Sequence, residues 1–269
     1  MVKKVILFFI SAFLLSCEVD IAGIFGSTDL NDRLEDTDTF NFIKPEWKKL
    51  SFGDNYEFIV ISDIHIIGRN AHGLENLKDH IGRAKFVVLT GDITQSGTQE
   101  EVNRFVEIAG TLGVPCFPVI GNHDIYFGNY HDVWRKTIGS TRYRIDADTT
   151  TLLVMDTANA FVGKAQFNWL KAQLRTAKPA AFVFTHANFF TDGASTPNQQ
   201  GLTNRVERAQ LVSLLAGSSK AHISGHIHKR IINKVNGTHF LTLEDFKTTQ
   251  NYCRISVNKE NVSWVFESL

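Results

Sequence analysis

Short apolar runs recur along this chain, and five of them end just before residues of types that commonly bind metal ions. The runs are rich in β-branched and aromatic residues, which is typical of buried strands in a mainly parallel sheet. The runs and the polar residues after them are 58–61 with Asp63 and His65, 86–89 with Asp92, 117–120 with Asn122, 182–184 with His186, and Ile223 with His226 and His228. Because ligands bind at the carboxyl ends of strands in open α/β sheets, we expect these seven side chains to lie together.

The segments between and after these runs carry patterns of their own. Apolar residues at helical spacing predict helices over residues 98–112, 164–175 and 206–215. Further apolar or alternating runs predict strands over residues 143–145, 152–155, 231–235, 239–243, 252–257 and 262–266. The pattern as a whole indicates an α/β protein whose C-terminal part is richer in strands than in helices. Asp156, just after one predicted strand, is expected to cap the end of that strand, and the alternative is that it supports the metal ligands from behind.

The seven polar residues form a mixed set of two carboxylates, one amide and four imidazoles. Imidazole and carboxylate together suit borderline divalent metals such as Mn, Fe, Zn, Co or Ni better than thiolates or an all-oxygen set would. One ion of these metals takes about four to six ligands, fewer than the seven available. The set therefore predicts two divalent metal ions that share one carboxylate.

Five motifs of this chain resemble, in order and spacing, the signature of the calcineurin-like metallophosphoesterases. They are Asp63-Ile64-His65, Gly91-Asp92, Gly121-Asn122-His123-Asp124, the single His186, and Gly225-His226-Ile227-His228. Each motif follows a predicted strand, and the resemblance spans residues 57–230. It implies an α/β fold of two packed β-sheets flanked by helices, an αββα sandwich, and the activity of a two-metal phosphoesterase.

The resemblance also implies a role for each site residue. The metal ligands would be Asp63, His65 and His228 for one ion and Asn122, His186 and His226 for the other, with Asp92 bridging the two. His123 would face the phosphoryl group or leaving oxygen of the substrate, and Asp124 would orient His123 through a hydrogen bond. Two such ions can hold a bridging water or hydroxide, lower the pKa of water toward about 7 and neutralise charge on the phosphoryl oxygens.

The motifs favour phosphodiesters over other substrates. The chain has no G-x-S-x-G motif and no Walker-type glycine loop, in agreement with attack by water. Purple acid phosphatases have Gly where His65 stands and a metal-binding Tyr where Gln95 stands, so the chain resembles instead the phosphodiesterase-like members. Only Lys229 and Arg230 adjoin the motifs, and a monoanionic phosphodiester needs less additional positive charge than a dianionic phosphomonoester. The alternatives are a phosphomonoesterase of the same fold and a non-catalytic surface lipoprotein that uses the fold as a binding scaffold.

Composition limits the partners and the number of domains. With 269 residues, 43% of them hydrophobic, the chain can bury one large core. Its 28 basic and 28 acidic residues balance, so there is no sign of the basic surface that nucleic acids require. The expected partner is a small phosphoester substrate. The sequence indicates no oligomeric state.

The N-terminus predicts a membrane anchor. Lys3 and Lys4 precede an apolar run over residues 5–15, which is shorter than the roughly 20 residues that span a bilayer but suits a signal peptide. Residues 14–17, Leu-Leu-Ser-Cys, resemble a bacterial lipobox. Cys17 would then be the lipidated first residue of an exported, membrane-anchored lipoprotein of the bacterial cell envelope. The alternative is an uncleaved apolar N-terminus with an incidental cysteine.

The predicted organisation is a signal peptide over residues 1–17, a flexible tether over 18–46 and a catalytic domain over 47–269. The tether is predicted because its stretch over residues 18–41 is acidic and has no sustained apolar period. Cys116 and Cys253 lie in apolar runs and are expected to be buried free thiols, with a disulfide between them as the alternative in an exported protein. Aromatic residues in the loops 125–142 and 187–205 could stack on a nucleobase or line a lipid groove, which leaves the natural substrate open.

Overall fold

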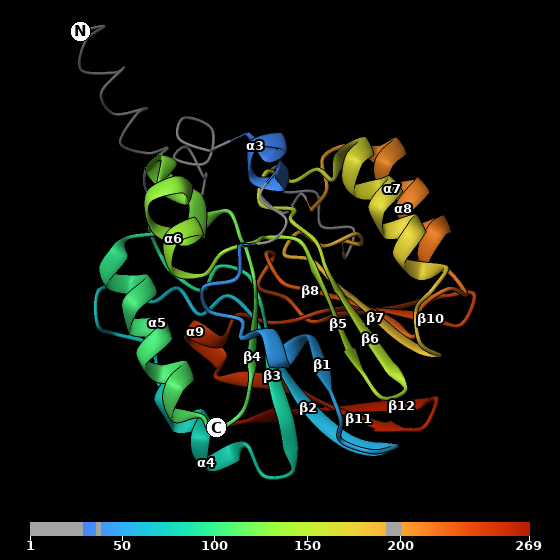
Figure 1. Ribbon diagram of the computed structural model, residues 1–269, viewed down its shortest axis with the longest axis horizontal. Helices are drawn as coiled ribbons and strands as arrows, with labels where there is room; N and C mark the ends of the chain where they lie inside the picture. The colour runs from blue at the N-terminus through green and yellow to red at the C-terminus, as the bar shows by residue number, and fades with distance from the viewer. Residues whose placement is uncertain (1–28, 36–38, 192–200) are drawn as a thin grey trace, which may run out of the picture.

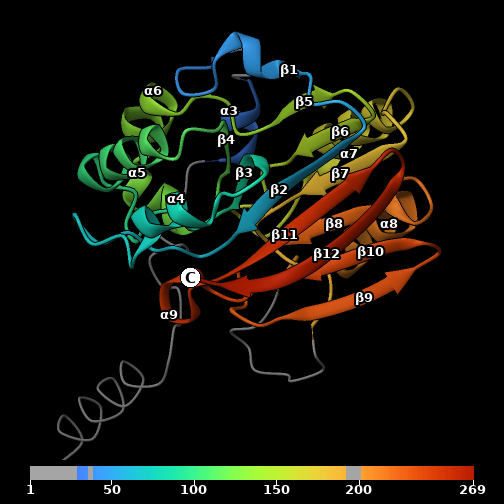
Figure 2. The ribbon, with the colours of Figure 1, turned by 90° about the horizontal axis from the view of Figure 1, so that it is seen from below.

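A computed structural model describes residues 29–35, 39–191 and 201–269, so the predicted signal peptide and Cys17 lie outside the described residues. Two β-sheets pack face to face, and helices cover the outer face of each sheet (Figure 1; Figure 2). This arrangement confirms the predicted αββα sandwich. Among the described residues, no helix combines the length and the apolar composition that a membrane crossing requires.

One sheet has five strands in the order β12, β11, β2, β3 and β4. They are β2 (Asn55–Ile61), β3 (Ala84–Thr90), β4 (Cys116–Val119), β11 (Asn251–Asn258) and β12 (Asn261–Ser268). β2, β3 and β4 are parallel, with Val60 opposite Val88 and Val88 opposite Phe117. This register brings the carboxyl ends of the three strands to one edge of the sheet.

The other sheet has seven strands in the order β1, β5, β6, β7, β8, β10 and β9. They are β1 (Lys49–Leu50), β5 (Tyr143–Ala147), β6 (Thr150–Val154), β7 (Ala180–Phe184), β8 (Ala221–Ser224), β9 (Ile231–Val235) and β10 (Thr238–Thr242). β6, β7, β8 and β10 are parallel neighbours, whereas β5 runs antiparallel to β6 and β9 runs antiparallel to β10. The short β1 pairs parallel with β5. The carboxyl ends of β7 and β8 therefore also lie at a common edge.

Helices form the two outer layers. The longer helices are α5 (Gln99–Thr111) on the five-stranded sheet and α7 (Gly163–Leu174) and α8 (Arg205–Leu215) on the seven-stranded sheet; the short ones are α3 (Leu30–Glu35), α4 (Leu77–His80), α6 (Arg135–Thr137) and α9 (Phe246–Thr249). Thr98 begins α5 with a capping box, in which its side chain and that of Glu101 each bind the main-chain N–H of the other. The three longer helices confirm the predicted ones to within about two residues.

Aromatic side chains hold the two sheets together. The rings of Phe58 on β2 and Phe86 on β3 stack with centroids 4.6 Å apart, and Phe58 meets Phe182 on β7 edge to face at 5.2 Å. Such contacts add to the free energy gained from burying the rings. Cys116 and Cys253 are buried free thiols, as expected, and burial raises the pKa of each to about 12.

The prediction of a flexible tether over residues 18–46 is wrong for the part of it that the structure describes. α3 packs on the domain with Leu30 and Arg33 buried, and Phe40 forms a β-bridge with Gly139. Because this segment is acidic, its composition does not reveal the few residues that become buried. Their partners are distant in sequence, because Arg33 pairs with Asp156, 123 positions later. The folded domain therefore begins well before residue 47.

Candidate metal centre

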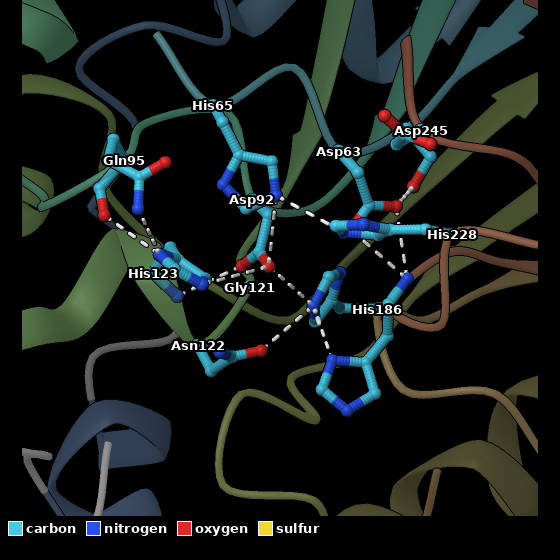
Figure 3. Close-up of polar contacts among 12 residues, drawn as sticks. Asp63, His65, Asp92, Gln95, Gly121, Asn122, His123, His186, His228 and Asp245 are labelled. Atoms are coloured by element: carbon cyan, nitrogen blue, oxygen red, sulfur yellow. Dashed lines mark hydrogen bonds and ion pairs between the residues drawn. The ribbon is translucent and has the colours of Figure 1, made fainter. Parts of the chain in front are cut away.

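The seven predicted ligands converge where the carboxyl ends of both sheets meet (Figure 3). Asp63 and His65 follow β2, Asp92 follows β3, Asn122 follows β4, His186 follows β7, and His226 and His228 follow β8. The five-stranded sheet thus provides four of the side chains and the seven-stranded sheet provides three. The histidines after β8 are partly exposed and the other five residues are buried, so the centre is open on one side.

Two groups of donor atoms correspond to the implied ligand sets, and a third group, His65, Asp92 and His123, shares one residue with each. In the first cluster, His228 Nε2 lies 3.4 Å from Asp63 Oδ1 and 3.3 Å from His65 Nε2. The second cluster surrounds His186, whose Nε2 lies 3.0 Å from Asn122 Oδ1 and 3.1 Å from His226 Nδ1. These are the groupings that the resemblance implied.

Asp92 belongs to both clusters. Its Oδ2 lies 3.2 Å from His186 Nε2 in the second cluster and 3.9 Å from His65 Nε2 in the first. The donor atoms of Asp63, His65 and His228, and those of Asp92, His186 and His226, each lie within 4.8 Å of one another. Because imidazole and carboxylate donors converge at ligand spacing, the residues present fit divalent metal ions.

The backbone conformation that turns these side chains inward costs free energy. Positive φ angles occur at Asp63 (52°), His65 (51°), Asp92 (49°), His226 (77°) and His228 (54°). The left-handed conformation costs a residue with a Cβ about 1–2 kcal/mol. Hydrogen bonds between loops hold it in place, because Asp63 N–H donates to Gly91 O at 3.1 Å and His65 N–H donates to Asp92 O at 2.9 Å. Such strain concentrates at functional sites.

His186 has its ring orientation fixed from behind. Nδ1 donates to the carbonyl oxygen of Thr90 at 2.9 Å, so Nε2 faces the centre. Burial lowers the pKa of His186, but the carboxylates of Asp92 and Asp63 raise it to about 10 overall. Binding of a divalent ion at Nε2 would therefore release a proton.

Two other histidines of the centre are already suited to bind metal at neutral pH. Burial lowers the pKa of His65 to about 4 and that of His226 to about 4. Both imidazoles are therefore neutral at pH 7, which is the form that coordinates a metal.

His123 lies beside the centre, between Gln95 and Asp92 (Figure 3). Its main-chain N–H donates to Asp92 Oδ1 at 2.9 Å, and its Nε2 lies 4.0 Å from Asp92 Oδ2. Nδ1 donates to the carbonyl oxygen of Gln95 at 2.8 Å, and the hydroxyl of Tyr126 lies 3.1 Å from Nε2. The contacts of Gln95 and Tyr126 with His123 were not predicted, and only the position of Tyr126 three residues after His123 could have suggested one of them.

Asp124 does not orient His123, so this prediction is wrong. Its carboxylate accepts main-chain N–H groups of Thr94 at 2.8 Å, Gly121 at 2.9 Å and Ile93 at 3.4 Å. Burial, and after it the charge of Asp92, raise the pKa of Asp124 to about 6. Asp124 thus joins the loops after β3 and β4, and it supports Asp92 and Asn122 through their backbone.

The aromatic residues of the two flanking loops are mostly not available to a substrate. Tyr130, Trp134 and Phe189 are buried, and the Phe189 ring stacks on His222 at 3.9 Å. The hypothesis of an aromatic rim therefore fails for these residues.

Residues 56–230 match the sequence model of the calcineurin-like phosphoesterase family. The 3',5'-cyclic adenosine monophosphate phosphodiesterase CpdA of Haemophilus influenzae is 22% identical over 215 residues, which are 76% of this chain and 78% of CpdA. The glycerophosphodiester phosphodiesterase GpdQ of Enterobacter lignolyticus is 31% identical over 173 residues, which are 57% of this chain and 62% of that protein.

Solved structures share the fold. The purple acid phosphatase PPD1 of yellow lupin superposes with a TM-score of 0.62 at 12% identity, covering 80% of this chain and 51% of that one. A dimetal phosphatase of Danio rerio superposes with a TM-score of 0.56 at 15% identity, covering 79% of this chain and 99% of that one. At these identities the likeness concerns the fold alone.

Proposed function

Because the chain belongs to the calcineurin-like phosphoesterase family, we propose that it hydrolyses phosphodiesters with two divalent metal ions held on either side of Asp92. The observation that carries this proposal is the position of Asp92 Oδ2, 3.2 Å from His186 Nε2 and 3.9 Å from His65 Nε2. One carboxylate oxygen thus faces both ligand clusters, as the sharing of a ligand by two ions requires.

The residues of the chain divide the work. When bound, two ions would lower the pKa of a water molecule and neutralise charge on the phosphoryl oxygens. His123 is bonded to Asp92 through its main chain, and its ring stands beside the clusters, where it can donate a proton to the leaving oxygen. When the His123 ring is neutral, its hydrogen bond to the Gln95 carbonyl keeps the single ring proton on Nδ1. A second ring proton, on Nε2, is therefore the one available to a substrate.

The surroundings of the centre support a diester. Three arginines in or near its loops bind elsewhere: Arg69 to Glu107 at 2.9 Å, Arg142 over the Trp169 ring at 5.2 Å, and Arg230 to Glu244 at 2.6 Å. A phosphomonoester dianion would gain from a cationic side chain in addition to the metals. Both curated relatives described above carry names of phosphodiesterases.

The test is Asp92→Asn, which keeps the size of the side chain and removes the shared charge. We expect hydrolysis of bis(p-nitrophenyl) phosphate with Mn²⁺ to fall by at least about 10²-fold, the scale of losing one charge stabiliser, while the fold is kept. The exposed Asp132→Asn is the matched control and should keep wild-type activity. Full activity after exhaustive chelation, or in Asp92→Asn, would refute the two-metal proposal.

Substrate class is tested by kcat/KM for bis(p-nitrophenyl) phosphate and p-nitrophenyl phosphate under one metal condition, followed by natural diesters. A clear preference for monoesters would make the protein a phosphomonoesterase. Bound metal without turnover of any phosphoester would favour the binding scaffold.

We also propose that the protein is a lipoprotein anchored through Cys17, which lies outside the described residues. The basic flank, the length of the apolar run and the lipobox support this anchor. Cys17→Ser should lose incorporation of a fatty-acid analogue. Cys116→Ser, at a buried thiol, should keep it. Equal label in wild type and Cys17→Ser would refute the anchor.

A further inference from the structure

Arg33 joins the N-terminal helix α3 to the loop between β6 and α7. Its guanidinium donates two parallel hydrogen bonds to Asp156, from Nε to Oδ2 at 2.7 Å and from Nη2 to Oδ1 at 2.8 Å, and Nη2 also donates to Asn159 Oδ1 at 2.5 Å. The side chains of Arg33 and Asp156 are both 0% exposed. Such a paired geometry fixes the orientation of both partners.

Asp156 is followed by a residue that touches the metal centre. The Thr157 hydroxyl oxygen accepts the main-chain N–H of His186 at 3.1 Å and that of Ala187 at 2.9 Å. Asp156 is itself held by Gln166, which accepts its N–H at 2.9 Å and donates to its carbonyl oxygen at 2.6 Å. A change in the position of Asp156 would therefore be transmitted to the backbone of His186.

α3 also touches the loop on the other side of the centre. The hydroxyl of Tyr130 donates to Arg33 O at 3.4 Å, and the guanidinium carbon lies 5.9 Å from the centroid of the Tyr130 ring. Tyr130 begins a π-helical turn, η4 (Tyr130–Trp134). The 3-10 helix η3 (His123–Gly128) begins directly after Asn122 and precedes this turn. In Figure 1, α3 and α6, the helix that follows η4, both lie above the sheets.

The two segments that α3 contacts each lie beside a ligand of the second cluster, because Thr157 binds the main chain of His186 and the helical turns that lead to Tyr130 begin directly after Asn122. Asn122 Oδ1 and His186 Nε2 lie 3.0 Å apart, although they come from different sheets. A buried ion pair contributes little net stability compared with an apolar core. Holding these two segments in place is therefore a role that the Arg33–Asp156 pair can have in addition to stability.

We propose that Arg33 is a positioning residue for the second metal cluster: through Asp156 and Thr157 on one side and Tyr130 on the other, it sets the spacing of His186 and Asn122. Arg33 lies outside residues 56–230, so a segment preceding the family-matched region completes the centre. The inference rests on the proposed function only in that a divalent ion binds this cluster.

The experiment measures Mn²⁺ binding to the full chain by equilibrium dialysis, so that its readout is independent of turnover. One variant is Arg33→Lys, which keeps the positive charge but cannot form the two parallel hydrogen bonds to Asp156. The other is Asp156→Asn. In both we expect the affinity of one of the two Mn²⁺ sites to fall about 10–100-fold, as for other residues that support a ligand from behind. The affinity of the other site should stay as in wild type.

Leu30→Ala is the matched control, because it removes a buried side chain of α3 and keeps the two parallel hydrogen bonds between Arg33 and Asp156. It should lower the melting temperature and leave both Mn²⁺ affinities unchanged. If Arg33→Lys and Asp156→Asn also keep both affinities, or lose both sites equally, the pair is structural and the inference is overturned. Wild-type protein that binds two Mn²⁺ without hydrolysing any phosphodiester would refute the proposed function and leave this inference standing.

Discussion

His123 is held on the main chain and on both ring nitrogens, so its contribution can be separated from metal binding. Its N–H binds Asp92 Oδ1, while its ring contacts the Gln95 carbonyl and the Tyr126 hydroxyl. His123→Ala should keep both metals and slow turnover by about 10²–10⁴, the range for a positioned acid. Metal content and kcat, measured together, test this.

Substrates with different leaving groups identify what His123 does. If it protonates the leaving oxygen, the loss in His123→Ala should shrink for diesters with acidic leaving groups. An equal loss across leaving groups would assign His123 to charge stabilisation, and loss of metal would make it a ligand. Gln95→Ala should lose little, because the shorter contact of Nδ1, at 2.8 Å, is with the Gln95 main-chain carbonyl, and the side-chain amide nitrogen lies 3.3 Å away.

His222 gives the fold a specific sensitivity to acid. Burial lowers its pKa to about 3, and Thr185 and Phe189 enclose it. Above pH 6.5 the imidazole is neutral in folded and unfolded chains. As the pH falls from 6.5 toward 3, only the unfolded chain gains the proton. The free energy of unfolding should then drop by about 1.4 kcal/mol per pH unit from this group.

Urea unfolding at several pH values checks this prediction. His222→Gln should unfold with a shallower decline between pH 6 and pH 4 than wild type. The surface substitution His131→Gln should keep the wild-type decline. Parallel declines in His222→Gln and wild type would contradict the prediction.

The individual candidate metal ligands could be predicted because each is an Asp, Asn or His residue shortly after an apolar run. The main-chain groups of Thr94, Gly121 and Gln95 that bind Asp124 and His123 could not be predicted. Every residue carries such groups, so the sequence contains no mark of them.

At the scale of elements, the turns after the strands need glycine for space. A Cβ at Gly121 would overlap the main-chain nitrogen and Oδ1 of Asp92. Gly121→Ala should therefore displace Asp92 and weaken Mn²⁺ binding by at least about tenfold, as loss of ligand support does. Gly110 in α5 has no atom within 4 Å of the position of its Cβ. Gly110→Ala should keep Mn²⁺ binding and add about 0.5–1 kcal/mol of stability.

Calorimetric titration of the two alanine variants with Mn²⁺ measures this difference. Equal affinities in Gly121→Ala and Gly110→Ala would show that the turn after β4 can move without disturbing Asp92.

Elements with a strong local pattern could be predicted, and those that depend on distant partners could not. β2, β3 and β7 each contain a continuous apolar run, and α5 has both a helical period and the Thr98–Glu101 cap. α3 has only six residues, and Arg33 is buried because Asp156 lies opposite. No window of sequence around residues 30–35 contains that information.

For the whole molecule, the centre links the two sheets, so bound metal should stabilise their packing. A ligand that binds only the folded state adds RT ln(1 + [L]/Kd), about 4 kcal/mol at 1,000 times its Kd. Chelation should lower the melting temperature, and added Mn²⁺ should restore it. Asp92→Asn should show a smaller response in a thermal melt. A melting temperature that is insensitive to chelator would contradict a metal link between the sheets.

The arrangement of the strands also fixes when a metal can first bind. Asp63 follows β2 and His228 follows β8, and each cluster combines donors from both sheets. Contacts so distant in sequence form late in folding, after long loops have closed. A chain that is still emerging from the ribosome, or that crosses a membrane unfolded, does not yet have these sites and cannot bind the ions. Any ion that binds these clusters must therefore be loaded after folding, and it comes from those available in the compartment where folding ends.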